Sequence, residues 1–448
     1  MNFFNNRHPA SYRDPAGFIF EEDGIVYRQV NQNYKEQYDH LMSSGLYQRL
    51  ITEGLLIKHE EVEKEKNEEA FTFLKPDQLD FVCPPYLWTY NMLKEAALLT
   101  LKIQQISLQY GMILKDAHPS NVQFIGTKPI FIDSLSFVQW DTTQPWIAYR
   151  QFCESFLFPL AIGHYLGPES TKFLRAWPAG VPIQFVEQLL PWKFRLNLHW
   201  NLHLHLNSKK SNKQNSPQAN TGFSTKRMKN LVESLQIATM NCETRKRTSP
   251  WIDYENEVLE RGNYSKRKHE IVLKWASEIN SKKTILDLGS NTGQYSKLLQ
   301  NNINRVIQIE SDPLTCNTLY IRNQKSQVNN TTTVCIDISE LIEKEQLSKS
   351  LRSEVVLCLG LLHHLLYRSN FSISLLFNLL SDLCQNYLII EFIPPDDPFV
   401  LRYFETDNIR NRTIFLPEFK KILASNFNII DESHLPNSSR LIYLCAPK

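Results

Sequence analysis

The chain has 448 residues, 42% of them hydrophobic, so it can bury more than one sizeable core, and we expect two domains. Its 49 lysines and arginines nearly balance 47 acidic residues, leaving a formal net charge of +2. This balance excludes an overall field that would draw the chain to nucleic acid or to an anionic membrane surface.

The N-terminus and the cysteines indicate where the protein works. MNFFNNRHPASYRDPAG lacks the charged start and apolar run of a secretion signal, and no stretch approaches about 18 uninterrupted apolar residues. The eight cysteines form no CxxC pair and no spacing typical of metal ligands, which indicates reduced thiols. We expect a cytoplasmic protein with no membrane span and no metal site.

The first strongly patterned segment, residues 86–111, predicts a mostly apolar helix that Gly111 ends. The loop LKDAHPSNVQFIGTKPIFIDSLSF follows it. Within this loop, NVQFI and PIFID predict two short strands around a turn at Gly126.

This loop resembles the catalytic loop and metal-binding segment of protein-kinase-like and aminoglycoside-phosphotransferase-like folds. By that resemblance Asp116 would accept the proton of a hydroxyl, and Asn121 and Asp133 would hold magnesium on ATP. However, no glycine-rich loop precedes the segment, and Ser-Leu stands where Phe-Gly is usual after Asp133. The resemblance implies an α+β kinase-like domain over residues 1–205, degenerate and holding or selecting a substrate; active phosphotransfer is the alternative.

The end of the first half holds three histidines and then a polar stretch. His199, His203 and His205 suggest a metal site, but no acidic or cysteine partner is near, so polar positions alternating with leucine on a half-buried element explain them better. Residues 207–230 are rich in Asn, Ser and Lys and cannot offset their ordering entropy by burial. We therefore expect a polar linker over residues 206–248.

Beyond the linker, apolar runs alternate with amphipathic segments. The predicted strands are TILDLG (284–289), RVIQIE (305–310), TTVCID (332–337), EVVLCLG (354–360) and YLIIEFI (387–393). Predicted helices cover residues 294–300, 313–324 and 371–384. This alternation predicts an α/β domain with a doubly wound parallel sheet.

Glycines and polar residues stand where the predicted strands end, which is the ligand-binding edge of such a sheet. The turn after the first strand holds Asp287, Gly289, Ser290, Asn291 and Gly293. Its glycines allow the backbone to approach a ligand, and the helix that follows offers free amide groups to a carboxylate.

The next strand ends have the chemistry of a nucleoside site. Glu310 ends the second strand, where a carboxylate can accept hydrogen bonds from both ribose hydroxyls. Asp337 ends the third and can accept from the exocyclic amine of adenine, while Ile338 and Leu359 can contact the ring.

Residues 284–448 resemble class I S-adenosylmethionine-dependent methyltransferases, through these features, the segment LGLLHHL and the final pair FNIIDESHL and RLIYLCAP. The resemblance implies a seven-stranded Rossmann-like sheet with an antiparallel last strand, a domain over residues 249–448, and S-adenosylmethionine as cofactor. A dinucleotide site is the nearest rival, but it needs G-x-G-x-x-G, and this chain has G-x-x-x-G. A tight turn in another doubly wound protein is the remaining alternative.

Several residues are candidates for the acceptor side. His363 or His364 can take a proton near neutral pH, or the pair can pack against the following helix and a loop. Glu391, with Asp396 and Asp397 beyond it, can orient an acceptor or cap a loop. Tyr264 can line the cofactor entrance or belong to the core.

The segments KDAHPSNVQFIG, PIFIDSLSF, PWIAYRQFCESFLFPL and LIIEFIPPDDP extend a resemblance to bacterial nodulation-type methyltransferases over nearly the whole chain. We therefore expect methyl transfer to an unidentified small-molecule, glycan, lipid or protein acceptor, with the N-terminal domain holding or selecting it. The alternatives are a bifunctional protein that also transfers phosphate from ATP with magnesium, and a non-catalytic nucleotide-binding scaffold.

Overall fold

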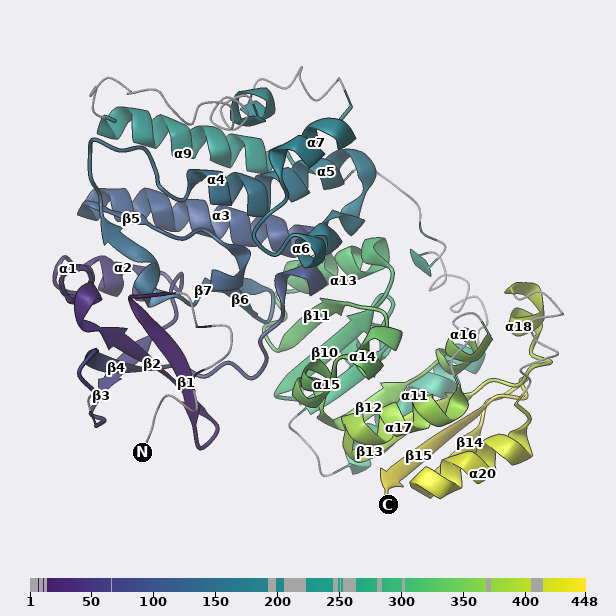
Figure 1. The fold of residues 1–448 in the computed structure, drawn as a ribbon. Coiled ribbons are helices and arrows are strands. Elements are labelled where there is room, and N and C mark those ends of the chain that lie inside the picture. Colours follow the sequence, from purple (N-terminus) through teal and green to yellow (C-terminus); the bar gives the residue numbers. More distant parts are fainter. Residues whose placement is uncertain are drawn as a thin grey trace. The chain divides into compact units, whose positions relative to one another are not determined.

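The structure, a computed structural model, divides into two compact units, Met1–Arg245 and Lys246–Lys448 (Figure 1). It describes residues 7, 11, 14–65, 67–191, 199–204, 223–244, 249, 251–252, 263–279, 284–299, 303–367, 372–403 and 414–448. Each unit is described by itself below.

The first unit begins with a four-stranded antiparallel sheet of order β1-β2-β4-β3. Its strands are β1 (Gly17–Glu22), β2 (Ile25–Asn31), β3 (His59–Val62) and β4 (Ala70–Pro76), with α1 (Lys35–Ser43) and α2 (Leu46–Thr52) between β2 and β3. Val30 and Leu74 pack with Tyr34, Tyr38 and Leu135 in a small core cluster.

The long helix α3 (Tyr90–Ser107) is the predicted helix, four residues shorter at each end than the prediction of 86–111. It begins late because the side chain of Thr89 caps it by accepting a hydrogen bond from the backbone N–H of Met92, and because Pro85–Leu87 form a separate 3-10 turn. It ends early because a 3-10 turn, Leu108–Tyr110, carries the chain to Gly111 at a φ of 69°.

Two short antiparallel pairs follow α3. β6 (Val122–Ile125) pairs with β7 (Lys128–Phe131), which confirms the two predicted strands around Gly126. β5 (Met112–Leu114) pairs with β8 (Phe137–Gln139). The later helices of the unit are α4 (Tyr149–Phe152), α5 (Phe158–Leu166), α6 (Phe173–Ala176), α7 (Ile183–Leu189) and α9 (Thr225–Met240).

Helix α9 lies inside the predicted linker, so the linker prediction of 206–248 is wrong for residues 225–240. Met228, Val232, Leu235 and Ala238 are buried at helical spacing, and α9 lies beside α3 (Figure 1). Because polar residues separate these apolar positions, their helical spacing was not recognised from the sequence. The first unit therefore extends to Arg245 and not to residue 205.

The second unit contains a seven-stranded sheet of order β11-β10-β9-β12-β13-β15-β14. The strands are β9 (Thr284–Leu288), β10 (Arg305–Glu310), β11 (Thr331–Cys335), β12 (Ser353–Cys358), β13 (Cys384–Phe392), β14 (Phe427–His434) and β15 (Leu441–Pro447). Neighbouring strands from β11 to β13 run parallel, whereas β15 runs antiparallel to both β13 and β14. The predicted strands and their antiparallel tail are confirmed.

Helices connect these strands and cover the sheet. They are α11 (Asn263–Glu278), α12 (Gln294–Leu299), α13 (Pro313–Lys325), α14 (Ser339–Glu343), α15 (Glu345–Leu351), α16 (Leu362–Tyr367), α17 (Ile373–Leu383), α18 (Pro398–Tyr403) and α20 (Leu416–Asn426). The predicted helices at 294–300, 313–324 and 371–384 correspond to α12, α13 and α17.

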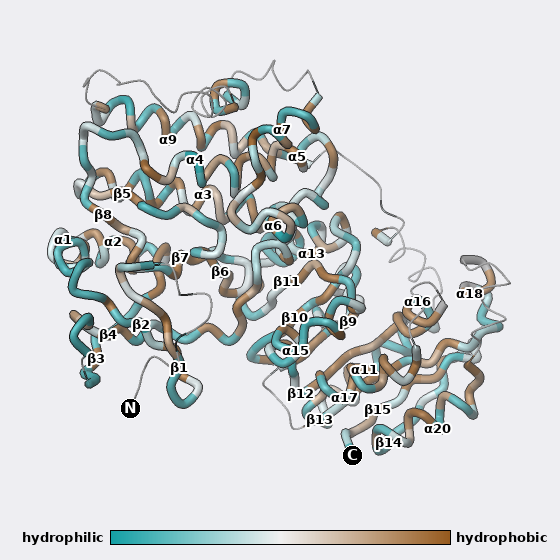
Figure 2. The backbone as a smooth tube through the Cα atoms, viewed as in Figure 1, coloured by the Kyte–Doolittle hydropathy of each residue, from teal (hydrophilic) through white to brown (hydrophobic). Residues whose placement is uncertain are grey.

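The central strands of this sheet are largely hydrophobic (Figure 2), and residues on both of their faces are buried, as the nearly all-apolar strands predicted. On one face Ile285, Leu357 and Ile389 pack with Val272 and Trp275 of α11. Their neighbours along the strands, among them Leu286, Val356 and Leu388, point to the opposite face and are also fully buried. Within the described residues, none of the helices combines the length and apolar composition needed to cross a membrane.

Candidate functional site

A cavity of about 430 Å³ opens at the carboxyl ends of β9, β10 and β12. The chain goes from β9 outward to β10 and β11 and then returns to the other side of β9 as β12, so the strand order reverses between β9 and β12. Ligands bind at this position in doubly wound sheets. Of the residues predicted to hold the cofactor, the cavity wall includes Asp287, Gly289, Ser290, Asn291, Glu310, Asp337, Ile338 and Leu359.

The loop between β9 and α12 has a backbone conformation that depends on its glycines. Gly289 has a φ of 66° and Gly293 a φ of 78°, both in the left-handed region. A Cβ on Gly289 would lie 2.9 Å from Leu361 Cδ1, and one on Gly293 would lie 2.7 Å from Gln308 Nε2. Gly293 therefore supports the loop against β10, behind the cavity wall.

Glu310, the last residue of β10, holds the loops around it. Its Oε2 accepts a hydrogen bond from the backbone N–H of Asn291 at 2.9 Å, and its Oε1 accepts one from the backbone N–H of Asp312 at 2.9 Å. Burial raises its pKa, while these backbone hydrogen bonds oppose the rise. Each carboxylate oxygen can accept further hydrogen bonds, so Glu310 can still receive two hydroxyl donors.

Asp287 is buried beneath the same loop, and its Oδ2 has no hydrogen-bond partner among the described residues. Burial raises the pKa of Asp287 to about 7, and the charge of Glu310 adds to this rise, whereas hydrogen bonds from Ser296 oppose it. An unsatisfied buried oxygen is costly unless a ligand donates to it. The cavity wall therefore fits a ligand that brings a hydrogen-bond donor, such as an amino group, to Asp287.

The third strand end and the end of β12 complete the predicted wall. Asp337 Oδ1 accepts from the backbone N–H of Ser339 at 2.8 Å and from its hydroxyl at 2.6 Å, and Asp337 lines the cavity. Ile338 and Leu359 are buried side chains of this wall. Together they provide the apolar surface that a flat ring needs.

The two adjacent histidines occupy different environments. His364 lines the cavity, whereas His363 is 4% exposed and does not line it. The ring centroids of the two are 4.0 Å apart. His364 is thus the member of the pair that faces the cavity.

A buried cluster of charged groups forms another part of the wall. Glu391 accepts hydrogen bonds from the Tyr264 hydroxyl at 2.6 Å and from Lys268 Nζ at 2.7 Å. Arg440 binds both carboxylate oxygens of Asp397 at 2.6 and 2.7 Å and donates to the Tyr264 hydroxyl at 2.9 Å. Burial opposes ionisation of Glu391, but the cations of Lys268 and Arg440 outweigh it and lower its pKa.

Tyr264 both belongs to the core and lines the cavity. Asp396, by contrast, is exposed. Sequence reasoning did not identify Lys268, Arg440 or Trp251 as cavity residues. Lys268 follows Tyr264 by four positions on α11, so helical periodicity could have placed it on the same face.

In the first unit, the residues predicted from the kinase-like resemblance are satisfied internally. Asp133 forms an ion pair with Arg28 of β2 and accepts from the Ser136 hydroxyl at 2.5 Å. Asn121 donates to that same hydroxyl oxygen at 3.3 Å, whereas Asp116 accepts from the backbone N–H of His118 at 3.0 Å. The structure links Asn121 with Asp133 but does not bring Asp116 into that chain of hydrogen bonds.

Among the described residues, no group of three His, Cys, Asp or Glu side chains could hold a metal ion. His203 is buried and lies 3.0 Å from the Tyr149 hydroxyl and 3.1 Å from the Ser234 hydroxyl, so it is a core histidine. Residues 199–204 are helical, so the half-buried element expected around His203 is a helix; His205 lies outside the described residues. All eight cysteines are buried and none is in a disulfide.

No family model matches this chain. It is 24% identical to nodulation protein NoeA of Rhizobium meliloti (strain 1021) over 98% of its own length and 95% of that protein. It is also similar to the solved structure of N-methyltransferase NodS from Bradyrhizobium japonicum WM9, with a TM-score of 0.34, 11% identity and coverage of 42% of this chain and 97% of that one. For magnesium protoporphyrin IX methyltransferase (ChlM) from Synechocystis PCC 6803 the TM-score is 0.34, with 16% identity and coverage of 46% and 90%.

Proposed function

We propose that the second unit binds S-adenosylmethionine in the cavity at the carboxyl edge of its sheet and transfers the methyl group to an acceptor. The observation that carries this proposal is the convergence of the glycine loop, Glu310 and Asp337 on one cavity at the point where the strand order reverses. The resemblance of residues 284–448 to class I methyltransferases supports the same cofactor.

The residues of the wall divide between the two ends of this cofactor. Glu310 would accept from the ribose hydroxyls, and Asp337 from the adenine amine, with Ile338 against the ring. Asp287, with its unsatisfied buried oxygen, would receive the amino group. When bound, the cofactor supplies a methyl group carried on a cationic sulfur, and transfer of that methyl group leaves a neutral thioether.

The chain's own contribution to the reaction is alignment and proton removal. The loop, Glu310 and Asp337 would hold one reactant in place, which converts a bimolecular encounter into a step within one complex. His364 would take the proton from an acceptor hydroxyl or amine, because it is the histidine that faces the cavity.

The first unit is proposed to hold or select the acceptor. The ion pair of Asp133 with Arg28 argues against phosphotransfer by this unit. Asp133 is the carboxylate that a kinase-like enzyme would use to bind magnesium, and here Arg28 already neutralises it. A carboxylate paired in this way favours a degenerate domain over ATP-dependent phosphotransfer.

Calorimetric titration of the full chain with S-adenosylmethionine tests the proposal. The wild type should bind, and Glu310→Ala should bind more weakly and lose its preference for the ribose over a 2′-deoxyribose analogue of the cofactor. Unchanged preference would show that Glu310 does not contact the hydroxyls, and absence of wild-type binding would refute the function. Labelled cofactor added to fractionated lysate would then identify the acceptor; binding without any transfer would favour the scaffold alternative.

A further inference from the structure

We infer that Trp251 is part of the cofactor site and stacks its indole ring on the adenine of the bound cofactor. This inference rests on the proposed function, since it assigns a further residue to the same site. Trp251 precedes α11 and belongs to none of the strand-end positions that the sequence pattern identifies. It nevertheless lines the cavity.

The segment that contains Ser249, Trp251 and Ile252 is tied to the cavity loops by hydrogen bonds. The carbonyl oxygen of Trp251 accepts from Asn291 Nδ2 at 2.9 Å. Ser249 is 4% exposed; its Oγ accepts from the backbone N–H of Trp251 at 3.2 Å and from the Thr315 hydroxyl at 3.4 Å. The segment is therefore held at both the β9–α12 loop and the first turn of α13.

These anchors are the same loops that Glu310 holds. Asn291 donates its backbone N–H to Glu310 while its side chain holds Trp251, and it adopts a φ of 48° to do so. A non-glycine residue in this conformation costs free energy, so the surrounding contacts must maintain it. Asn291 thus couples the position of Trp251 to the proposed ribose-binding carboxylate.

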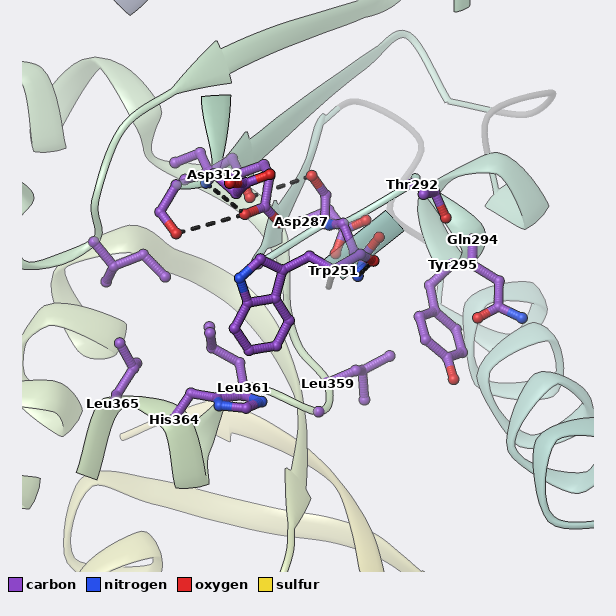
Figure 3. A pocket seen from close by; sticks show the side chains of 18 of the residues that line it. Trp251, Asp287, Thr292, Gln294, Tyr295, Asp312, Leu359, Leu361, His364 and Leu365 are labelled. Atoms are coloured by element: carbon purple, nitrogen blue, oxygen red, sulfur yellow. Dashed lines mark hydrogen bonds between the residues drawn. The ribbon is translucent and has the colours of Figure 1, made fainter. Parts of the chain in front are cut away.

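The indole lies across the cavity and is not folded away from it. In Figure 3 it lies between Asp312 on one side and Leu361 and His364 on the other. Its ring centroid is 5.0 Å from that of His364, with the two rings nearly perpendicular at 88°. The indole therefore extends from the ribose-binding loops towards the proposed acceptor base.

The adenine ring is the part of the cofactor whose chemistry matches this side chain. Aromatic side chains stack on nucleobases, and their replacement by alanine weakens binding by roughly 5- to 150-fold. Asp337 would read the edge of the ring, whereas stacking needs an aromatic face, which Ile338 and Leu359 do not provide. Trp251 supplies that face.

Calorimetric titration of full-length variants with S-adenosylmethionine, S-adenosylhomocysteine and 5′-methylthioadenosine tests this inference. Trp251→Ala should weaken the binding of all three ligands by about the same factor, at least about fivefold, because all three contain adenine. Trp251→Phe should lose less affinity than Trp251→Ala. The matched control is Ile252→Ala, because Ile252 is the next residue and is not part of the cavity wall; this variant should bind the ligands as the wild type does.

The outcomes separate this inference from the proposed function. If the wild type binds and Trp251→Ala binds equally well, the inference is wrong and the proposed function stands. If only the binding of S-adenosylmethionine is weakened, the indole contacts the sulfonium cation and the adenine assignment is wrong. If the wild type binds none of the three ligands, the proposed function itself fails.

The hydrogen bond from Asn291 to Trp251 provides a second test of the inference. Asn291→Gly keeps the left-handed backbone accessible and removes the side chain that holds Trp251. It should weaken binding in the wild-type background and have little further effect in Trp251→Ala. Equal effects in both backgrounds would show that the two residues act independently, contrary to the inference.

Discussion

At the scale of single residues, Asp287 determines how cofactor binding should depend on pH. Its pKa of about 7 lies above the unfolded value of about 3.9, so the folded protein keeps this carboxyl protonated up to a higher pH than the unfolded chain does. Its contribution to stability therefore falls as the pH rises from about 4 to about 7, by about 1.4 kcal/mol for each pH unit. Below pH 7, an incoming ammonium group should displace the proton.

Titrations in buffers of different ionisation enthalpy check this prediction. The wild type should release a proton on binding S-adenosylmethionine at pH 6 and should bind more tightly as the pH approaches 7. Asp287→Asn should release none and should bind more weakly at pH 7. Equal proton release by the two proteins would show that Asp287 does not receive the amino group.

His364 and His363 form a natural pair of test and control. His364→Gln should lower kcat by about 10²- to 10⁴-fold, with little effect on cofactor affinity. His363→Gln should chiefly reduce stability, because this side chain is buried away from the cavity. A larger loss of kcat in His363→Gln would reverse the assignment.

At the scale of elements, the turn from β9 into α12 depends on backbone that only glycine adopts cheaply. Gly289→Ala should cost about 1–2 kcal/mol for its left-handed φ and more for the contact with Leu361, and should weaken cofactor binding. Gly54, at a φ of 65° and with no atom within 4 Å of an added Cβ, provides the matched control. Denaturant unfolding measures the stability of Gly289→Ala and of the control Gly54→Ala. Calorimetric titration should show weaker cofactor binding in Gly289→Ala alone.

At the scale of the whole molecule, the two units should respond separately to substitutions. Arg28→Ala leaves the buried carboxylate of Asp133 without its cation, so it should lower the free energy of unfolding of the first unit by about 3–5 kcal/mol. Cofactor affinity should not change, because the cavity residues all belong to the second unit. Denaturation followed with and without S-adenosylmethionine measures both effects.

The same ion pair makes a prediction about ATP. Burial opposes ionisation of Asp133, but Arg28 and a hydrogen bond from Ser136 lower its pKa, so the carboxylate is charged and already paired. The wild type should therefore bind ATP weakly or not at all in the presence of magnesium. Magnesium-dependent ATP binding that Asp133→Asn abolishes would support the phosphotransfer alternative.

Periodicity by itself determined most of the second unit. The strands, the main helices and the antiparallel tail follow from local patterns, since a strand buried on both faces must be apolar throughout. The loop of Gly289 and the position of Glu310 were also predictable, because the ends of parallel strands meet at one edge. Helix α9 was not, because its apolar positions are separated by Lys, Asn and Ser and become meaningful only against α3.

Tertiary structure alone decided which polar groups meet. Lys268, Glu391 and Arg440 are far apart in the sequence but share one buried cluster, and Arg28 neutralises Asp133 across 105 positions. Trp251 enters the cavity through hydrogen bonds to loops distant from it in sequence. Such pairings depend on distances of a few ångströms between side chains of different elements, and spacing along the chain relates only residues within one helix or strand.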